Sequence, residues 1–461
     1  MLCKFSDKTR EPEALAYFDS ATGLMSDGAG AVGAYWNAIS YNQINIHGSQ
    51  TYNWVFLPGT EASYQTTDAM GQPDFNYRKV ATDCAQATIN ANPGLNLDAF
   101  KGINFVLNDE IVGFSLGGQV NFTLGGTTTV RAQTWLMPWA YHVEPGFTSG
   151  PAPMEHEMGH AFLLWHSGNN AGVEYKDSWD VMGNSYVNCS ALNLVQPPYG
   201  CPGQSVTGYD KDYLGWIAAN QKLAYAGVTR QITLTSLLNG TAGNYLVASI
   251  PHTSNINFTY VEMRFQTGLD NRLPGNGVII HEIDTTDTSV SKRVQSADGD
   301  IGAIRPVDQA YAVPNTTVSV TVKSVNGNNA VVVISNGQAP TISPDSAPAG
   351  TITTGSVLTL TGTNFSPEAT VSFGSTPATQ VTVNGDGSSL TVTVPPLTGN
   401  GLPIIVTNPD GRTGILSPRV APPTHFPGVS GGTPAPQPSV HPTLAPMAPP
   451  VSTPLPQPVR H

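Results

Sequence analysis

Residues 153–168 read PMEHEMGHAFLLWHSG, and this short stretch decides how the rest of the chain is interpreted. It contains three of the chain's 10 histidines: His156, His160 and His166. Because residues four apart share one face of a helix, His156 and His160 can direct two imidazole rings at one ion. Glu157 lies beside the same point, and His166 supplies a third ring if the helix ends after His160 and the chain turns back.

This spacing predicts a catalytic zinc site, with Zn²⁺ as the cofactor. Catalytic zinc takes three protein ligands and keeps one position for a water molecule, whose pKa it lowers toward neutrality. We therefore expect His156, His160 and His166 to be the metal ligands and Glu157 to be the general base. By composition alone the pattern arises by chance in about one of ten thousand such chains. The alternative is three core or surface histidines that bind nothing. Glu155 is expected to be a solvated or helix-N-terminal carboxylate.

The bulk composition indicates a secreted, β-rich protein with roughly two to four domains. Charged residues make up 11% of the 461 residues, and 47 glycines and 38 prolines indicate many turns. The net charge of -12 argues against a nucleic-acid partner, because the chain offers little to neutralise phosphates. No apolar run is long enough to span a membrane.

The 4 cysteines are too few for a disulfide scaffold. Cys189 and Cys201 lie in one loop, where a disulfide would contribute roughly 3 kcal/mol through loop entropy; two unrelated thiols are the alternative. Cys3 and Cys84 are expected to pack as small apolar residues.

Residues 1–217 mix helical and strand patterns, which predicts an α/β layer structure. We expect helices over AVGAYWNAIS (31–40) and ATDCAQATINAN (81–92), and a third helix that begins with the three-histidine stretch. The expected strands are LCKFSD (2–7), INIHGS (44–49), GINFVLND (102–109) and TTTVRAQTWLM (127–137).

The remainder of the chain is predicted to be β-rich. Residues 218–338 alternate or run apolar between Gly and Asn turns, as in an all-β sandwich. Residues 339–419 carry a second pattern of short strands. Residues 420–461 are Pro-dense with almost no charge and are expected to form a disordered tail or linker.

The motif HEMGHAFLLWH resembles the metzincin zinc signature HExxHxxGxxH, and DSWDVMGN (177–184) places Met182 where the methionine turn of that family is expected. Over residues 1–300 the chain is also similar to the gametolysin-like family of secreted metallopeptidases and its bacterial relatives. The stretches that carry this similarity are YWNAISYNQINIHGS (35–49), NWVFLPG (53–59), EYKDSWDVMGN (174–184), YDKDYLGWI (209–217) and the segment 260–284.

The resemblance implies a secreted zinc metalloendopeptidase with a metzincin-like zincin catalytic domain over 1–217. In it, Met182 packs beneath the metal without binding it. The start, MLCKFSDKTREPEALAYF, has no h-region of a signal peptide, so the protein is cytosolic or its sequence lacks the true start. Because LCKFSD resembles the first strand of the catalytic domain in the bacterial relatives, we expect a secretion signal to precede it.

Leu163 departs from the family pattern, which has Gly there because the chain must turn sharply. A leucine at positive φ is penalised. Either the turn is made another way, at about 1–2 kcal/mol, or the helix runs on. In the second case Glu174, Asp177 or Asp180 would be the third ligand. We expect His166, because the methionine turn that accompanies it is also present.

Substrate would be an extended protein or peptide paired with an edge strand, with TTTVRAQTW (127–135) as the candidate. Tyr186, four residues after Met182, is a possible donor to the oxyanion, and a packing tyrosine is the alternative.

Residues 340–418 closely resemble an IPT/TIG domain, an immunoglobulin-like fold. The similarity is carried by the Pro348/Gly350 opening, LTLTGTNF through Phe365, VSFG through Gly374, LTVTVP through Pro395 and VTNPDG through Gly411. In secreted enzymes such modules are spacers or bind an extracellular matrix, cell-wall or polysaccharide surface.

The sequence is compatible with two other functions. One is a non-catalytic adhesion or glycan-binding protein on a decayed peptidase scaffold, and the other is a zinc hydrolase that cleaves another type of bond. Intact His156, Glu157 and His160 argue against decay.

Overall fold

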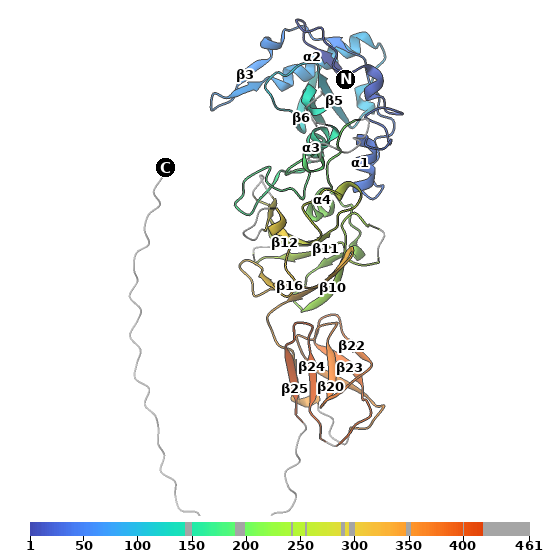
Figure 1. The fold of residues 1–461 in the computed structure, drawn as a ribbon, viewed down its shortest axis with the longest axis vertical. Coiled ribbons are helices and arrows are strands. Elements are labelled where there is room, and N and C mark those ends of the chain that lie inside the picture. Colours follow the sequence, from blue (N-terminus) through green and yellow to red (C-terminus); the bar gives the residue numbers. More distant parts are fainter. Residues whose placement is uncertain are drawn as a thin grey trace, which may run out of the picture. The chain divides into compact units, whose positions relative to one another are not determined.

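The computed structural model describes nine stretches of the chain, which Figure 1 draws in colour. They are residues 1–142, 150–189, 199–240, 243–253, 256–286, 291–294, 300–346, 352–399 and 401–417. Met1–Pro418 forms one compact unit. The predicted tail, 420–461, and the predicted Pro348/Gly350 opening lie outside the described residues.

A five-stranded sheet, ordered β2-β1-β5-β7-β6, forms the centre of the first half. Its strands are β1 (Leu2–Lys4), β2 (Val55–Phe56), β5 (Gly102–Leu107), β6 (Leu116–Leu124) and β7 (Thr127–Leu136). Four of them are parallel, and β6 pairs antiparallel with β7 at the edge. The strands predicted for LCKFSD, GINFVLND and TTTVRAQTWLM are confirmed.

The strand predicted for INIHGS is wrong. Within 44–49 the amide of Ser49 donates to the carbonyl of Ile46 over 3.1 Å, and the amide of His47 donates to the side chain of Asn45 over 3.2 Å. These local bonds satisfy the backbone without a partner strand, so the segment forms turns.

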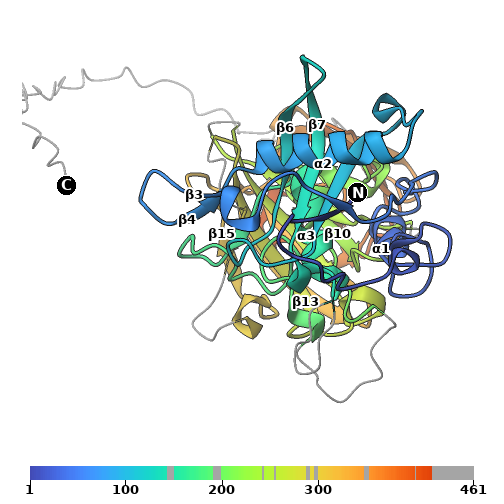
Figure 2. The same ribbon diagram turned by 90° about the horizontal axis from the view of Figure 1, so that it is seen from above.

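Helices cover both faces of the sheet. Successive residues of a strand point to opposite sides, and here both sides carry apolar side chains. Phe105 and Trp135 point toward α2 (Tyr77–Ala91), whereas Val106 and Leu136 point toward the other face. That second face is covered by α1 (Val32–Ile39) and α3 (Pro151–Ala161). Figure 2 shows α2 lying across the strands. The three predicted helices and the α/β layers are therefore present.

Both pairs of cysteines form disulfides. Cys3 of β1 is bonded to Cys84 of α2, with Cα atoms 5.9 Å apart, and Cys189 is bonded to Cys201, with Cα atoms 5.4 Å apart. The prediction that Cys3 and Cys84 are simply packed apolar residues is wrong. They are buried, but the helix and the strand bring the two sulfurs together across 81 residues of sequence.

The second half is built on two sheets that pack face to face. A six-stranded sheet is ordered β8-β14-β13-β12-β11-β9, and a four-stranded sheet is ordered β10-β17-β16-β15. The first contains β8 (Ser167–Gly168), β9 (Lys222–Ala224), β11 (Val247–Pro251), β12 (Asn257–Arg264), β13 (Gly277–Asp284) and β14 (Ser291–Arg293). The second contains β10 (Arg230–Thr235), β15 (Ala310–Ala312), β16 (Ser319–Asn326) and β17 (Asn329–Ser335).

One strand of the six-stranded sheet comes from the first half of the chain. β8 follows His166 directly and pairs in parallel with β14. The predicted boundary at residue 217 therefore separates segments that share a sheet.

The C-terminal module is all-β, with two four-stranded antiparallel sheets around one apolar core. One sheet contains β18 (Thr341–Ile342), β19 (Val357–Thr363), β22 (Val381–Val383) and β23 (Ser389–Thr393). The other contains β20 (Thr370–Phe373), β21 (Thr376–Pro377), β24 (Ile404–Thr407) and β25 (Thr413–Leu416). The first half also contains a hairpin of β3 (Gln65–Thr67) and β4 (Pro73–Phe75) and the short helix α4 (Gly208–Tyr213). In the part of the chain that the structure describes, no helix has the length and apolar character needed to cross a bilayer.

Candidate metal centre

Helix α3 ends at Ala161, about one turn after His156, and the conformation of Leu163 terminates it. The amide of Leu163 donates to the carbonyl of His160 over 2.9 Å, and the amide of Leu164 donates to that of Gly159 over 3.0 Å. These two bonds are those of a Schellman motif, which needs a residue in the left-handed region at the position of Leu163. Its φ is 68°. The helix thus does not run on, and the sharp turn is not avoided: the leucine itself adopts the conformation usual for glycine.

The turn brings the three histidines together. The Nε2 atom of His160 lies 3.2 Å from that of His156 and 2.9 Å from that of His166. The Nδ1 atoms of His156 and His160 each lie 2.8 Å from a backbone carbonyl, of Val181 and Leu164 respectively. A carbonyl only accepts, so both Nδ1 atoms carry the proton and both Nε2 lone pairs face the common point.

This donor set fits a tetrahedral zinc ion. Zn–N bonds of 2.0–2.1 Å in that geometry place two nitrogens about 3.3 Å apart. The observed Nε2 separations are close to that value. Among the described residues, these three histidines form the one group of metal-binding side chains whose ligand atoms lie within 4.8 Å of one another.

The histidines are also in the protonation state that metal binding needs. Burial lowers the pKa of His156 to about 3 and that of His166 to about 4, and the neighbouring His160 adds to both shifts. Burial likewise lowers the pKa of His160. Neutral imidazole is the form that binds a metal, so no proton has to be displaced near neutral pH.

Glu157 is buried beside the edge strand β6. Its burial raises the pKa of the carboxyl to about 8. A Cβ atom built on Gly117 of β6 would lie 1.8 Å from the backbone carbonyl oxygen of Glu157. The glycine therefore allows β6 to pass directly against α3 at the level of the glutamate.

Met182 lies directly against α3, between the first two histidines. It is fully buried, and a Cβ atom on Gly159 would lie 2.4 Å from its Sδ atom. We call residues 177–184 the methionine loop. Two hydrogen bonds close the loop. The amide of Asn184 donates to the carbonyl of Asp177 over 2.8 Å, and the amide of Gly183 donates to the carbonyl of Asp180 over 3.0 Å.

The carboxylates considered as alternative third ligands have other partners. Glu174 lies 3.5 Å from Nδ1 of His166, on the side of the ring away from the other histidines. Asp177 lies 2.8 Å from Nε2 of His281, and Asp180 accepts from the amide of Met182 over 3.0 Å. These positions favour His166 as the third donor.

The prediction for Glu155 is wrong. Its side chain has no exposed surface and accepts from the amide of Gly203 over 2.6 Å. Burial raises the pKa of this carboxyl well above its usual value. Glu155 lies on a face of α3 that packs into the protein. The sequence of α3 has charged and apolar residues on several faces, so it did not indicate which face is buried.

Tyr175 is the residue that the sequence analysis missed. Its hydroxyl lies 3.0 Å from Nε2 of His166, and the ring centroids are 4.3 Å apart. Burial, together with the charges of Glu174 and Glu157, raises its pKa to about 12. The predicted Tyr186 is 42% exposed; burial and the charge of Glu157 raise its pKa to about 12 as well. No sequence signal distinguished Tyr175 from other tyrosines.

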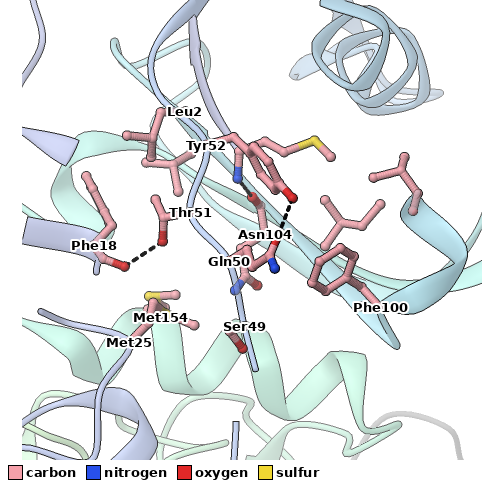
Figure 3. Close-up of a pocket in the computed structure, with 15 residues that line it drawn as sticks. Leu2, Phe18, Met25, Ser49, Gln50, Thr51, Tyr52, Phe100, Asn104 and Met154 are labelled. Atoms are coloured by element: carbon pink, nitrogen blue, oxygen red, sulfur yellow. Dashed lines mark hydrogen bonds between the residues drawn. The ribbon is translucent and has the colours of Figure 1, made fainter. Parts of the chain in front are cut away.

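Two cavities lie on the opposite side of α3. One, of about 90 Å³, is lined by residues that include Leu2, Asn104 and Met154 (Figure 3). The other, of about 370 Å³, has Met158 in its wall. Residues two apart on a helix point in nearly opposite directions, so Met154 and Met158 face away from the histidines. These cavities do not contribute to the metal centre.

Residues 19–315 match the protein family described as "Gametolysin peptidase M11", and residues 338–420 match the IPT/TIG domain. No curated protein matches the chain. Among solved structures, SGBP-B from a complex xyloglucan utilization locus in Bacteroides uniformis is 18% identical, with a TM-score of 0.18, over 34% of this chain and 47% of that one. Gamma-CGTase from alkalophilic Bacillus clarkii is 19% identical, with a TM-score of 0.14, over 35% of this chain and 24% of that one.

A third structure, the Bacteroides ovatus mixed-linkage glucan utilization locus SGBP-B in complex with a mixed-linkage heptasaccharide, is 13% identical, with a TM-score of 0.13, over 41% of this chain and 56% of that one. The chain thus spans less than two thirds of each of these structures. At such TM-scores the similarities carry no argument about fold or function.

Proposed function

Because the chain belongs to the gametolysin peptidase family, we propose that it is a secreted zinc metalloendopeptidase with a metzincin-like catalytic fold. The observation that carries the proposal is the convergence of His156, His160 and His166, with Nε2 separations of 3.2 and 2.9 Å. Zinc held by these atoms would lower the pKa of a water molecule and polarise the substrate carbonyl.

The residues of this chain then have distinct roles. Burial raises the pKa of Glu157, but the positive charge of a bound zinc ion would favour the ionised carboxylate. In that form Glu157 accepts a proton from the attacking water and later donates it to the nitrogen of the leaving amine. Tyr175 or Tyr186 donates a hydrogen bond to the oxyanion that forms as the water attacks. Met182 supports the two histidines of α3 from below.

The substrate strand pairs with β6 in this proposal. The edge strand predicted for this role, TTTVRAQTW, is wrong: the segment is β7, which already has β5 and β6 on its two sides. β6 is the edge, so its outer backbone groups are available to an extended peptide. The contact between Gly117 and Glu157 places this edge beside the proposed general base.

The metal can be tested by elemental analysis of the purified protein. We expect one zinc per chain in the wild type and its loss in His166→Ala. His47→Ala is the matched control, because the His47 side chain is 67% exposed. Zinc retained in His166→Ala would assign the third ligand to a carboxylate such as Glu174.

Hydrolysis can be tested with casein. Glu157→Gln keeps the shape of the side chain but cannot accept a proton, so it should bind zinc and lose activity. Glu11→Gln, an exposed change in the same half of the chain, should remain active. A wild type that binds zinc and cleaves no protein would favour a binding protein or a hydrolase of another bond.

The IPT/TIG domain at 338–420 is proposed as a spacer or a surface-binding module. Co-sedimentation of the full chain with insoluble polysaccharides separates the two, because a spacer alone should leave the chain in solution.

A further inference from the structure

The six-stranded sheet is buried on both faces. Along β12 and β13, alternate side chains point toward the four-stranded sheet. These are Val261, Met263, Val278 and Ile280. The residues between them point toward the first half of the chain. These are Glu262, Arg264, Ile279 and His281, and all four side chains are fully buried. The second face is therefore not a solvent face but a contact surface.

His281 and Arg264 attach this second face to the methionine loop. Nε2 of His281 lies 2.8 Å from Oδ2 of Asp177, which begins the loop. Nη1 of Arg264 donates to the carbonyl of Trp179 over 2.6 Å. The Trp179 ring packs with Leu273, Ile279 and Ala303. Two polar bonds and one buried aromatic ring thus fix the loop on the sheet.

The loop in turn holds two of the proposed metal ligands. The carbonyl of Val181 lies 2.8 Å from Nδ1 of His156. The carbonyl of Met182 accepts from the amide of Ser167, directly after His166, over 3.2 Å. A displacement of the loop would therefore rotate the ring of His156 and shift the strand that directly follows His166.

We propose that His281 is a positioning residue of the metal centre, which acts through Asp177 and the methionine loop on His156 and His166. This inference rests on the proposed zinc site and adds a residue from the sheet to its support. Hydrogen bonds beyond the ligands orient the rings of a metal site, and their loss commonly weakens metal binding by about 10- to 100-fold. The proposed catalytic unit then includes β12 and β13 as well as residues 1–217.

The test compares three variants of the full chain. His281→Leu removes the bond to Asp177. His281→Gln keeps a donor near the position of Nε2. Ile280→Ala is the matched control, because it weakens the same strand on the face that does not contact the loop. If His281→Leu does not fold, His281→Asn replaces it, since its side chain is too short to reach Asp177.

The first measurement is zinc affinity, by competition with a chelator. We expect at least about a tenfold loss in His281→Leu, recovery to within about threefold in His281→Gln, and wild-type affinity in Ile280→Ala despite a lower melting temperature. Equal losses in His281→Leu and Ile280→Ala would overturn the proposal, as would wild-type affinity in His281→Leu.

The second measurement is amide hydrogen exchange of the metal-free protein. His281→Leu should speed exchange in the methionine loop and at Ser167, whereas Ile280→Ala should not; the same rate in both would overturn the proposal. A wild type that binds zinc and cleaves nothing would refute the peptidase proposal while this inference stands. Full peptidase activity of the wild type, with no effect of His281→Leu on zinc affinity or exchange, would refute this inference and leave the peptidase proposal standing.

Discussion

Nδ1 of His156 lies 2.8 Å from the carbonyl oxygen of Val181, the residue before Met182. Helix α3 and the methionine loop are thus connected by a hydrogen bond as well as by the packing of Met182 on Gly159. The bond fixes which nitrogen of His156 carries the proton and therefore which nitrogen is free for a metal. The geometry of the site depends on loops as much as on the helix.

Leu163→Gly should stabilise the protein. The leucine has φ 68° and a 42% exposed side chain, so its removal relieves backbone strain and loses little packing. We expect the free energy of unfolding to rise by roughly 1 kcal/mol, measured by denaturant titration. Leu163→Ala keeps the Cβ atom and should give no gain; an equal gain in both would assign the effect to the exposed side chain instead.

Gly117→Ala should disturb the site, whereas Gly118→Ala should not. A Cβ atom on Gly117 would meet the carbonyl oxygen of Glu157 at 1.8 Å, but one on Gly118 would meet nothing closer than 4.0 Å. Backbone must move in the first case, and we expect a loss of about 3 kcal/mol or more in the free energy of unfolding. Thermal melts of the two variants check this, and similar melting temperatures would contradict the close approach of β6 to α3.

Tyr175→Phe should lower kcat more than Tyr186→Phe does. The Tyr175 hydroxyl lies 3.0 Å from Nε2 of His166, within reach of a carbonyl bound at the same point. Loss of one oxyanion donor commonly lowers kcat by about a hundredfold or more. Zinc content and KM should stay near the wild-type values. A large effect of Tyr186→Phe alone would return the role to the tyrosine that the sequence suggested.

The Cys3–Cys84 bond should contribute more stability than the Cys189–Cys201 bond. The sequence separations are 81 and 12 residues, and the loop-entropy relation gives about 4.5 against about 3 kcal/mol. Two double Cys→Ser variants, each lacking one disulfide, give the contribution of each bond to the free energy of unfolding when they are compared by denaturant titration. The opposite order would indicate residual structure in the unfolded chain or strain relieved on removal.

The bond between His281 and Asp177 should make stability depend on pH. Burial alone would lower the pKa of His281, but the hydrogen bond and charge of Asp177, with the charges of Glu262 and Asp180, raise it above 6.5. The protonated form is then favoured by folding, so its contribution is complete below about pH 6.5 and is lost as pH rises through the folded-state pKa.

The measurement is the difference in unfolding free energy between the wild type and His281→Gln from pH 5.5 to 8.5. The other histidines are the same in both proteins, so their titration cancels. We expect the advantage of the wild type to shrink as pH rises. An advantage that grows with pH would show that His281 is neutral in the folded state.

Local patterns in the sequence predicted the local structure well. The spacing of apolar residues predicted α1, α2 and most strands of the first sheet. The spacing of His156, His160 and His166 predicted that they meet, because helix geometry and one turn determine it. The INIHGS segment was predicted wrongly, since its apolar alternation is overridden by the local hydrogen bonds of Asn45 and Ile46, and the strands β2 and β6 were not predicted.

What the sequence did not reveal depends on distant contacts. Cys3 pairs with Cys84, Tyr175 reaches His166 through a loop, and Glu155 is buried against Gly203. Nothing in the spacing of these residues encodes their meeting. The position of β8 in the six-stranded sheet is of the same kind, because its partner β14 belongs to a much later segment.

That pairing has a consequence for the order of events during synthesis. The ribosome makes Ser167 long before Ser291, so while the first half emerges the strand after His166 is bonded to nearby residues such as Met182 and Tyr175 but lacks its partner β14. Domains generally fold as the chain appears, and contacts between distant segments form late. The third histidine would then be fixed only after most of the sheet has been made. A nascent or truncated chain would therefore hold the proposed zinc ion more weakly than the full chain does, and the proposed peptidase activity would depend on completion of the six-stranded sheet.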